Sequence, residues 1–291
     1  MTSISPRVVI LGGNGFTGSA LRRAFTAEHG CAKVTPLASS DFDLLGDDAP
    51  VRLAGWLDDK TILVVTARSR AGEPFAQFDG EVRMAANVAR SLALKRVRKC
   101  VYFSTLSVYD DTRTDLAITE NTPVAPASFY GLGKHTAESL LRLTADRHGV
   151  PLLVFRPCKI YGPGDPSGAY GPASFVQAAL AGGPMAIYGD GRELRDHLFI
   201  DDLARAVVPL ALSEAEGVYN LASGESHSFA ELLDIVRRIV ARDFLVVRQA
   251  RTRPLIDQMI EMDKLRAALP GWRPTPLAEG VRLLYQALVA A

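Results

Sequence analysis

Residues 8–18 read Val-Val-Ile-Leu-Gly-Gly-Asn-Gly-Phe-Thr-Gly, an apolar run that passes directly into a glycine-rich turn. Helical periodicity follows over Gly18–Ala27, so the turn joins a buried strand to an amphipathic helix. Glycines allow a tight turn, and a helix N-terminus presents free N–H groups and a favourable dipole to an anion. The stretch favours a pyrophosphate site over an ordinary glycine-rich turn. The expected contacts are Gly12, Gly15, Phe16, Thr17 and Gly18.

The same alternation continues along the chain. Strand-length apolar runs lie at Val34–Leu37, Ile62–Val65, Cys100–Phe103 and Leu152–Phe155, and helical periodicity recurs at Glu81–Leu94 and Lys134–Arg147. This order predicts an α/β fold of the Rossmann type, a doubly wound parallel sheet with helices on both faces. Ligands of such sheets bind beyond the carboxyl ends of the strands.

After Pro163 the sequence becomes rich in glycine and proline, and the elements become shorter. We therefore expect a dinucleotide-binding domain over residues 1–162 and a smaller, mainly substrate-binding lobe over residues 163–291. Gly217–Ala222 has the character of another buried strand, so the chain is expected to return to the large sheet around residues 195–222. The active site is expected in the cleft between the two domains.

Composition favours small-molecule chemistry. The 291 residues carry a formal net charge of +1, which gives no electrostatic reason to expect nucleic acid or a membrane surface as a partner. The three cysteines lie far apart and no histidine stands at ligand spacing, so we expect neither a disulfide framework nor a metal site. The chain shows no leader and no apolar run of bilayer length, which predicts a cytoplasmic protein.

The end of the second predicted strand reads Ala38-Ser39-Ser40. A dinucleotide site usually has Asp or Glu there to bind the adenosine ribose. Without that carboxylate the hydroxyls of Ser39 and Ser40 could donate to a 2′-phosphate, so NADP is permitted beside NAD. The two serines could equally be plain loop residues.

Two further segments carry candidate catalytic groups. The strand Cys100–Phe103 ends in Ser104-Thr105-Leu106-Ser107, and Tyr130-Gly131-Leu132-Gly133-Lys134 opens a helix on which the phenol and the ammonium share one face. A free phenol ionises only near pH ~10, and a nearby cation favours the ionised form. We expect Tyr130 to exchange a proton with a substrate hydroxyl or carbonyl, Thr105 to hydrogen-bond the same oxygen, and Lys134 to assist Tyr130 and contact the nicotinamide ribose.

In this order the segments resemble the extended short-chain dehydrogenases, the NAD-dependent epimerase/dehydratase family of nucleotide-sugar enzymes. The resemblance spans nearly the whole chain and also rests on Arg156–Pro163, Tyr188–Gly191, Arg195–His197 and Asp201–Ala204. It implies that Thr105, Tyr130 and Lys134 are catalytic. It also implies that Asp43 and Leu44 lie by the adenine, that Thr66, Ala67, Ser104 and Pro157 line the ribose and nicotinamide, and that Arg195 holds the diphosphate of the sugar nucleotide. An ion pair of Arg195 with Asp196 or Glu193 is the weaker alternative.

Departures from the family pattern narrow the reaction. Leu106-Ser107 stands where 4,6-dehydratases have an Asp-Glu pair, so elimination of water is disfavoured. Ser107 and Gly164 replace the Cys and His of the bifunctional fucose-synthase branch. Lys159 stands where the family usually has Asn, which would add a positive charge beside the substrate. His197 replaces a common aromatic residue and would contact substrate or simply pack.

The resemblance leaves three functions open. An epimerase of a nucleoside-diphosphate sugar, acting by transient hydride abstraction at a ring carbon such as C4, is slightly favoured. An NADPH-dependent 4-ketosugar reductase is the alternative. A cofactor-sensing binding protein is a third, although such relatives usually lose the Tyr or the Lys, and this chain keeps both. Family dimers pair through two helices, here near Glu81–Leu94 and Lys134–Arg147, so a homodimer is expected.

Overall fold

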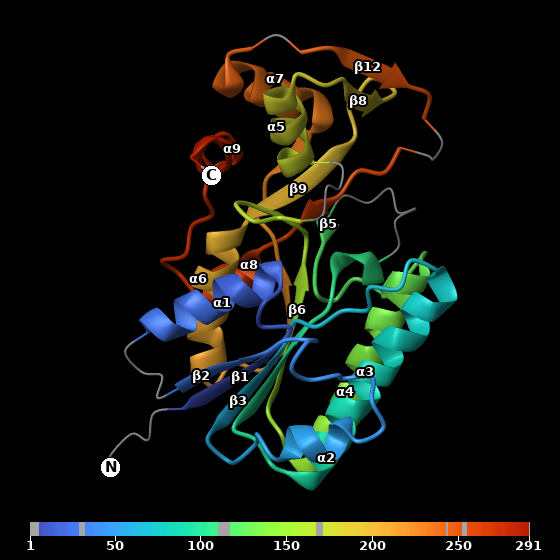
Figure 1. Ribbon diagram of the computed structural model, residues 1–291, viewed down its shortest axis with the longest axis vertical. Coiled ribbons are helices and arrows are strands. Elements are labelled where there is room, and N and C mark those ends of the chain that lie inside the picture. Colours follow the sequence, from blue (N-terminus) through green and yellow to red (C-terminus); the bar gives the residue numbers. More distant parts are fainter. Residues whose placement is uncertain are drawn as a thin grey trace. The chain divides into compact units, whose positions relative to one another are not determined.

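The computed structural model describes residues 6–28, 33–109, 117–166, 171–242, 244–251 and 255–290 (Figure 1). The chain forms two compact units. The first takes its described residues from 6–109, 122–157 and 204–219, and the second takes the rest, from 117–121, 158–203 and 220–290. Each polypeptide unit is therefore assembled from separate stretches of the chain.

A six-stranded sheet in the order β10-β6-β4-β3-β1-β2 forms the centre of the first unit. The strands are β1 Arg7–Leu11, β2 Lys33–Leu37, β3 Thr61–Val65, β4 Lys99–Phe103, β6 Leu152–Pro157 and β10 Gly217–Leu221. The pairs β2–β1, β1–β3, β3–β4 and β4–β6 are parallel, so the carboxyl ends of these strands share one edge. The predicted doubly wound α/β fold is confirmed, including the return of the chain at Gly217.

Helices cover this sheet because its strands are apolar on both faces. Alternate residues such as Val9, Leu11, Leu63 and Val65 belong to one core cluster with α2 Ala49–Ala54, α3 Pro74–Leu94 and α4 Phe129–His148. Val8 and Ile10, also fully buried, point to the opposite face, because successive side chains of a strand alternate. In Figure 1, α3 and α4 lie side by side along one face, away from α1 Phe16–Ala27 and α6 Ile200–Leu212.

The second unit is built from smaller sheets and its own helices. One three-stranded sheet has the order β11-β9-β7, with β7 Lys159–Tyr161, β9 Leu194–Phe199 and β11 Ser226–Ser228. Two strand pairs join β8 Met185–Tyr188 to β12 Val246–Gln249 and β5 Ala117–Ile118 to β13 Met259–Ile260. The helices are α5 Pro172–Ala181, α7 Phe229–Val240, α8 Asp263–Ala268 and α9 Leu277–Val289. A separate hydrophobic core contains one aromatic residue from each of β7, β9, α5 and α7, namely Tyr161, Phe199, Phe175 and Phe229.

Helix ends differ from the sequence expectation mainly at N-termini. The structure begins α3 at Pro74 and α4 at Phe129, several residues before the periodic stretches at Glu81 and Lys134. Both starts carry cap residues, because Glu73 accepts hydrogen bonds from the N–H groups of Phe75 and Ala76, and Ser128 accepts one from Gly131. Among the described helices, none is both long and apolar enough to cross a bilayer.

Candidate active site

The glycine turn after β1 is as tight as its sequence predicts. Gly12 has φ +80°, and a Cβ there would lie 2.9 Å from Oγ1 of Thr66 and 2.9 Å from the nitrogen of Ala67. A Cβ on Gly18 would lie 2.2 Å from the carbonyl oxygen of Gly12. Side chains are therefore excluded at Gly12 and Gly18, and the helix begins directly against the turn.

This turn fits the phosphates of a dinucleotide. Gly15 caps α1 without a side-chain hydrogen bond, and Phe16, Thr17 and Gly18 form its first turn. The N–H groups of a first turn have no partner within the helix, so they remain available to a phosphate, which the helix dipole also favours. The chain's first five predicted cofactor contacts thus lie together at the carboxyl end of β1.

The loop after β2 contains a carboxylate that the sequence analysis did not assign. Ser39 and Ser40 are exposed, and the hydroxyl of Ser40 lies 3.1 Å from Oδ1 of Asp41. Asp41 is placed by a turn in which its N–H donates to the carbonyl of Ala38 at 3.0 Å. A carboxylate, that of Asp41, therefore lies three positions beyond Ala38 in the loop that follows β2.

The other residues expected near the adenine and ribose have structural contacts of their own. Thr66 donates from its hydroxyl to the carbonyl of Leu11 at 2.8 Å, which joins the end of β3 to the glycine turn. Asp43 is exposed and accepts a hydrogen bond from the N–H of Leu45 at 2.9 Å. Leu44 is buried in the α3 side of the core, and its carbonyl accepts from Asn87. Ala67 lies beside Gly12, as given above.

The hydroxyls after β4 form a compact group. Thr105 begins a short 3-10 helix, η1 Leu106–Val108, and its Oγ1 accepts from the N–H of Ser107 at 3.2 Å. The two hydroxyl oxygens of Thr105 and Ser107 are 3.3 Å apart. Ser104 is buried, and its hydroxyl has no hydrogen-bond partner among the described residues. A buried hydroxyl without a partner among the described residues, at the carboxyl edge of the sheet, fits a polar ligand there.

Gly131 brings the Tyr130 turn of α4 to this group. A Cβ on Gly131 would lie 2.1 Å from the carbonyl oxygen of Ser107, so the first turn of α4 packs directly on η1. Tyr130 precedes this contact and is partly exposed. The structure thus brings the turn that carries Tyr130 against the segment that carries Thr105 and Ser107, as the catalytic interpretation requires.

Lys134, one turn further along α4, is almost completely buried. Its Nζ lies 3.1 Å from Oε2 of Glu81 on α3 and donates to the carbonyl of Phe103 at 3.2 Å. Burial by itself lowers the pKa of Lys134, but nearby Tyr102 and Glu81, with smaller effects from Tyr130 and the Glu81 hydrogen bond, raise that pKa above its ordinary value. Lys134 is therefore a cation at neutral pH. The sequence analysis did not single out Glu81, although it falls on the apolar stripe of α3 with Met84, Val88 and Leu92, where a charge is unusual.

Pro157, the last residue of β6, follows a buried ion pair. Arg156 donates through Nε and Nη2 to both carboxylate oxygens of Glu138 on α4, at 3.0 and 2.7 Å. Its Nη1 donates to the hydroxyl of Tyr109 at 2.8 Å. This network joins β6, α4 and the residue after η1, and so connects the segments that carry the candidate residues Thr105 and Tyr130.

In the second unit, Lys159 and His197 are direct neighbours on β7 and β9. His197 is 5 % exposed, and its ring packs edge-on against Tyr161 and Phe229. Burial, followed by the positive charges of Lys159, His227 and Arg195, lowers the pKa of His197 to about 3. The carbonyl of Arg195 opposes this shift, but neither ring nitrogen makes a hydrogen bond of normal geometry with a described residue. The position of His197 corresponds to the packing alternative.

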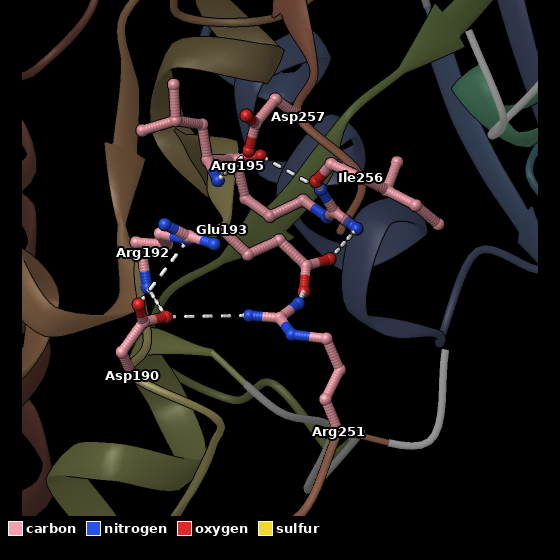
Figure 2. Close-up of polar contacts among 8 residues, drawn as sticks. Asp190, Arg192, Glu193, Arg195, Arg251, Ile256 and Asp257 are labelled. Carbon is pink, nitrogen blue, oxygen red and sulfur yellow. Dashed lines mark hydrogen bonds and ion pairs between the residues drawn. The ribbon is translucent and has the colours of Figure 1, made fainter. Parts of the chain in front are cut away.

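Arg195 sits in a network of alternating charges (Figure 2). Its guanidinium pairs with Glu193 and donates to the carbonyls of Leu194 and Ile256. Glu193 also pairs with Arg251, with 2.9 Å between the Nη1 and Oε2 atoms, and Arg251 lies 3.7 Å from Asp190. Two guanidinium groups therefore share one carboxylate. The Glu193 pair that the sequence offered as an alternative is present in this structure.

The sequence of this chain is similar to those of known proteins. The model of the NAD dependent epimerase/dehydratase family matches residues 8–222. The UDP-glucose 4-epimerase of Mycolicibacterium smegmatis is 32% identical over 70% of this chain and 67% of its own length. A putative UDP-glucose 4-epimerase of Methanocaldococcus jannaschii is 28% identical over 70% of this chain and 68% of its own.

Solved structures show the same fold over almost the whole chain. The UDP-glucose 4-epimerase of Thermus thermophilus in complex with NAD has a TM-score of 0.86 and 24% identity, covering 98% of this chain and 99% of its own. RMD from Pseudomonas aeruginosa, complexed with NADPH, has a TM-score of 0.85 and 22% identity over the same shares. The match to the family model confirms the predicted enzyme class and the predicted nicotinamide dinucleotide cofactor. The chain belongs to the NAD-dependent epimerase/dehydratase family.

Proposed function

We propose that this protein is an epimerase of a nucleoside-diphosphate sugar that inverts one ring carbon, C4, with a bound nicotinamide dinucleotide. The named relatives that are UDP-glucose 4-epimerases support this choice. The observation that carries it is the close approach of Gly131 to the Ser107 carbonyl. This approach packs the helix turn of Tyr130 against the segment that contains the hydroxyls of Thr105 and Ser107. Leu106 is buried and apolar, which disfavours the acid–base elimination of a dehydratase.

The chain's own residues divide the work of proton transfer. Tyr130 exchanges a proton with the hydroxyl at the reacting carbon, and Thr105 hydrogen-bonds the same oxygen. Lys134 holds a positive charge beside them and has a third N–H to offer, since Glu81 and the Phe103 carbonyl take two. A bound nicotinamide dinucleotide would supply the acceptor and donor for the hydride of the sugar carbon.

Replacement of the phenol tests this assignment. Tyr130→Phe removes the proton-transferring atom and keeps the ring, so we expect turnover of UDP-glucose to fall about 10³-fold or more, within the range of acid–base catalysis. Titration with NADH should give the wild-type affinity. The matched control is Tyr188→Phe, an exposed tyrosine of the second unit that should leave turnover unchanged. An active Tyr130→Phe enzyme would assign the proton transfer to another group.

Asp41 favours NAD over NADP and therefore the epimerase over the reductase. Its carboxylate suits the two ribose hydroxyls of NAD and repels a 2′-phosphate. It also accepts a hydrogen bond from the Ser40 hydroxyl, which could otherwise have donated to that phosphate. We expect mass spectrometry to detect NAD released from the purified protein. Asp41→Asn should narrow the preference for NADH over NADPH in titrations. An empty protein that prefers NADPH would support the 4-ketosugar reductase, which delivers hydride once.

Arg195 is proposed to hold the substrate diphosphate, with Lys159 as a further cation on the same face of the three-stranded sheet. Lys159 pairs with His197, which lies two residues from Arg195 on β9, so all three side chains point to one side. Two guanidinium groups around Glu193 give a fork-shaped donor set for phosphate oxygens once that carboxylate is displaced.

A homodimer through α3 and α4 is also proposed. The large apolar residues exposed on these helices are Phe75, Leu94, Phe129, Leu132 and Leu143, and the rings of Phe75 and Phe129 lie 4.4 Å apart. Light scattering after gel filtration should give a molar mass of twice the chain mass. For Leu143→Glu the measured molar mass should fall toward that of a single chain. A monomer at micromolar concentration would contradict the proposal. A cytoplasmic location is proposed with it, in keeping with the free thiols of Cys100 and Cys158.

A further inference from the structure

Glu81 is a buried carboxylate with both oxygens committed. Its side chain is 2 % exposed, Oε2 lies 3.1 Å from Nζ of Lys134, and Oε1 accepts from the N–H of Ser69 at 2.7 Å. Ser69 belongs to the segment after β3 that also contains Thr66 and Ala67. One carboxylate thus connects helix α3, helix α4 and the loop at the carboxyl end of β3.

Two glycines make room for this arrangement. A Cβ on Gly80 would lie 2.5 Å from Oγ of Ser69, and a Cβ on Gly133 would lie 3.1 Å from Cβ of Glu81. Any side chain at Gly80 would push the Ser69 segment away, and one at Gly133 would press on Glu81 itself. The close approach of α3 and α4 at this level is therefore built around the carboxylate.

Stability alone does not account for such a pair. Removing a carboxylate and an ammonium from water is costly, and well-packed apolar residues of similar volume often replace a buried ion pair at no loss. The pair does two things that apolar residues would not. It fixes Nζ against the Phe103 carbonyl, and it keeps the ammonium charged where burial would otherwise favour the neutral amine.

We propose that Glu81 is a positioning residue for Lys134, holding its ammonium charged and in place at the Tyr130 turn, and connecting it through Ser69 to the segment that follows β3. The inference rests on the proposed function for the role of Lys134 in turnover. The electrostatic coupling between Glu81 and Lys134 is independent of that function, because it is measurable without substrate.

Glu81→Gln tests the coupling, because glutamine keeps the shape and an oxygen for Ser69 but removes the charge. Glu81→Gln removes the charge and the carboxylate hydrogen bond that help to raise the pKa of Lys134, while burial still lowers that pKa, so we expect it to fall. On the NAD-loaded enzyme we expect kcat for UDP-glucose to fall about 10- to 100-fold, within the range of a misplaced catalytic group. The alkaline limb of the kcat profile should move at least about one pH unit toward acid, with KM nearly unchanged. Glu73→Gln, an exposed carboxylate at the start of the same helix, should leave the profile in place.

A double-mutant cycle separates positioning from general damage. In a Lys134→Met background, Glu81→Gln should change kcat by less than about twofold, because the residue through which it acts is gone. An equal loss in both backgrounds, or an unchanged pH profile in a folded Glu81→Gln enzyme, would overturn the proposal. Glu81→Asp, which keeps the charge, should retain the wild-type position of the alkaline limb even if kcat falls.

A substrate-free readout covers the case in which the proposed function fails. In Glu81→Gln we expect the pKa of Lys134 in the folded state to lie below its value in the unfolded state. The free energy of unfolding of this variant should then rise as the pH rises through the lowered pKa, because the unfolded state binds more protons there. The gap in urea midpoint between wild type and Glu81→Gln should therefore shrink between pH ~7 and pH ~10. A constant gap would overturn the coupling even if no nucleotide sugar turns over. If Glu81→Gln does not fold, Glu81→Asp takes its place. It keeps the charge, so its urea-midpoint gap from wild type should stay constant between pH ~7 and pH ~10, and a gap that shrinks over that range would overturn the proposal.

Discussion

Two ion pairs of predicted functional cations, Lys134–Glu81 in the first unit and Arg195–Glu193 in the second, differ in what surrounds the carboxylate. The Lys134–Glu81 side chains are 3 % and 2 % exposed and lie between two helices. The Arg195–Glu193 side chains are 21 % and 18 % exposed, two residues apart, and Glu193 is shared with Arg251. We therefore expect the first pair to be fixed by packing and the second to be exchangeable. On this view a buried pair positions a group, whereas a partly exposed, shared pair leaves room for a competing anion.

The comparison would break if buried pairs of the first unit proved as dispensable as exposed ones, and the largest effect we expect is at Arg156–Glu138. Glu138→Ala leaves the Arg156 guanidinium buried and uncompensated, since the pair is 3 % and 0 % exposed. Loss of one partner of a buried pair costs about 3–5 kcal/mol in the free energy of unfolding. Urea denaturation monitored by circular dichroism measures it. Asp234→Asn, from an exposed pair on α7, is the control and should match wild type.

A loss under about 1 kcal/mol for Glu138→Ala would contradict the view that this network is fixed by its surroundings. Since Arg156 also donates to Tyr109, the residue after η1, the folded fraction of the variant should also lose turnover. Cofactor titration of that fraction distinguishes a displaced η1 from simple unfolding.

Much of the first unit could be predicted from sequence because its signals are local. Apolar runs predict strands, glycines at Gly12 and Gly18 predict a turn without room for side chains, and parallel strands place all of their carboxyl ends at one edge. The helix turn that carries Tyr130 accordingly lies against the segment of Thr105 and Ser107, with Gly131 at the contact. Gly131 was quoted in the pattern only for spacing, while the structure shows that it is the contact that seats α4 on η1.

The partners of the predicted residues were harder to predict. Glu81 on α3 pairs with Lys134 on α4, which lies more than 50 positions later in the chain, and helical periodicity alone indicates only that Glu81 falls on a buried stripe. Asp41 lies past the expected position at the end of β2, so a fixed offset missed it. Arg195 was assigned to an anionic ligand, but the choice between that ligand and Glu193 depends on Arg251, more than 50 residues later.

His197 sharpens the comparison, because it is a buried group of the second unit, and the charges of described residues that shift its pKa are all positive. Its pKa is lowered to about 3, so folding favours the neutral ring, and stability is lost as pH falls from the unfolded value near 6.5 toward 3. Between pH ~7 and pH ~5 the neutral His197 should lower the free energy of unfolding by about 2 kcal/mol. His197→Phe should remove that part of the acid loss, as measured by urea midpoints at both pH values. The same acid loss in His197→Phe would mean that the ring is not held neutral in the fold.

The smallest effect, and the most selective, is expected at Glu193. Glu193→Gln removes the charge that Arg195 and Arg251 share, while Arg195 stays held by the carbonyls of Leu194 and Ile256. Because the pair is partly exposed, the free energy of unfolding should change by less than about 1 kcal/mol. The competing carboxylate is gone, so UDP should bind more tightly, by about three- to tenfold, in isothermal titration. For Glu81→Gln we expect the opposite pattern, with a displaced pH profile for kcat and a nearly unchanged KM. Weaker UDP binding by Glu193→Gln would mean that Glu193 orients the two guanidinium groups rather than competing for them, and the contrast between the fixed and the exchangeable pair would then fail.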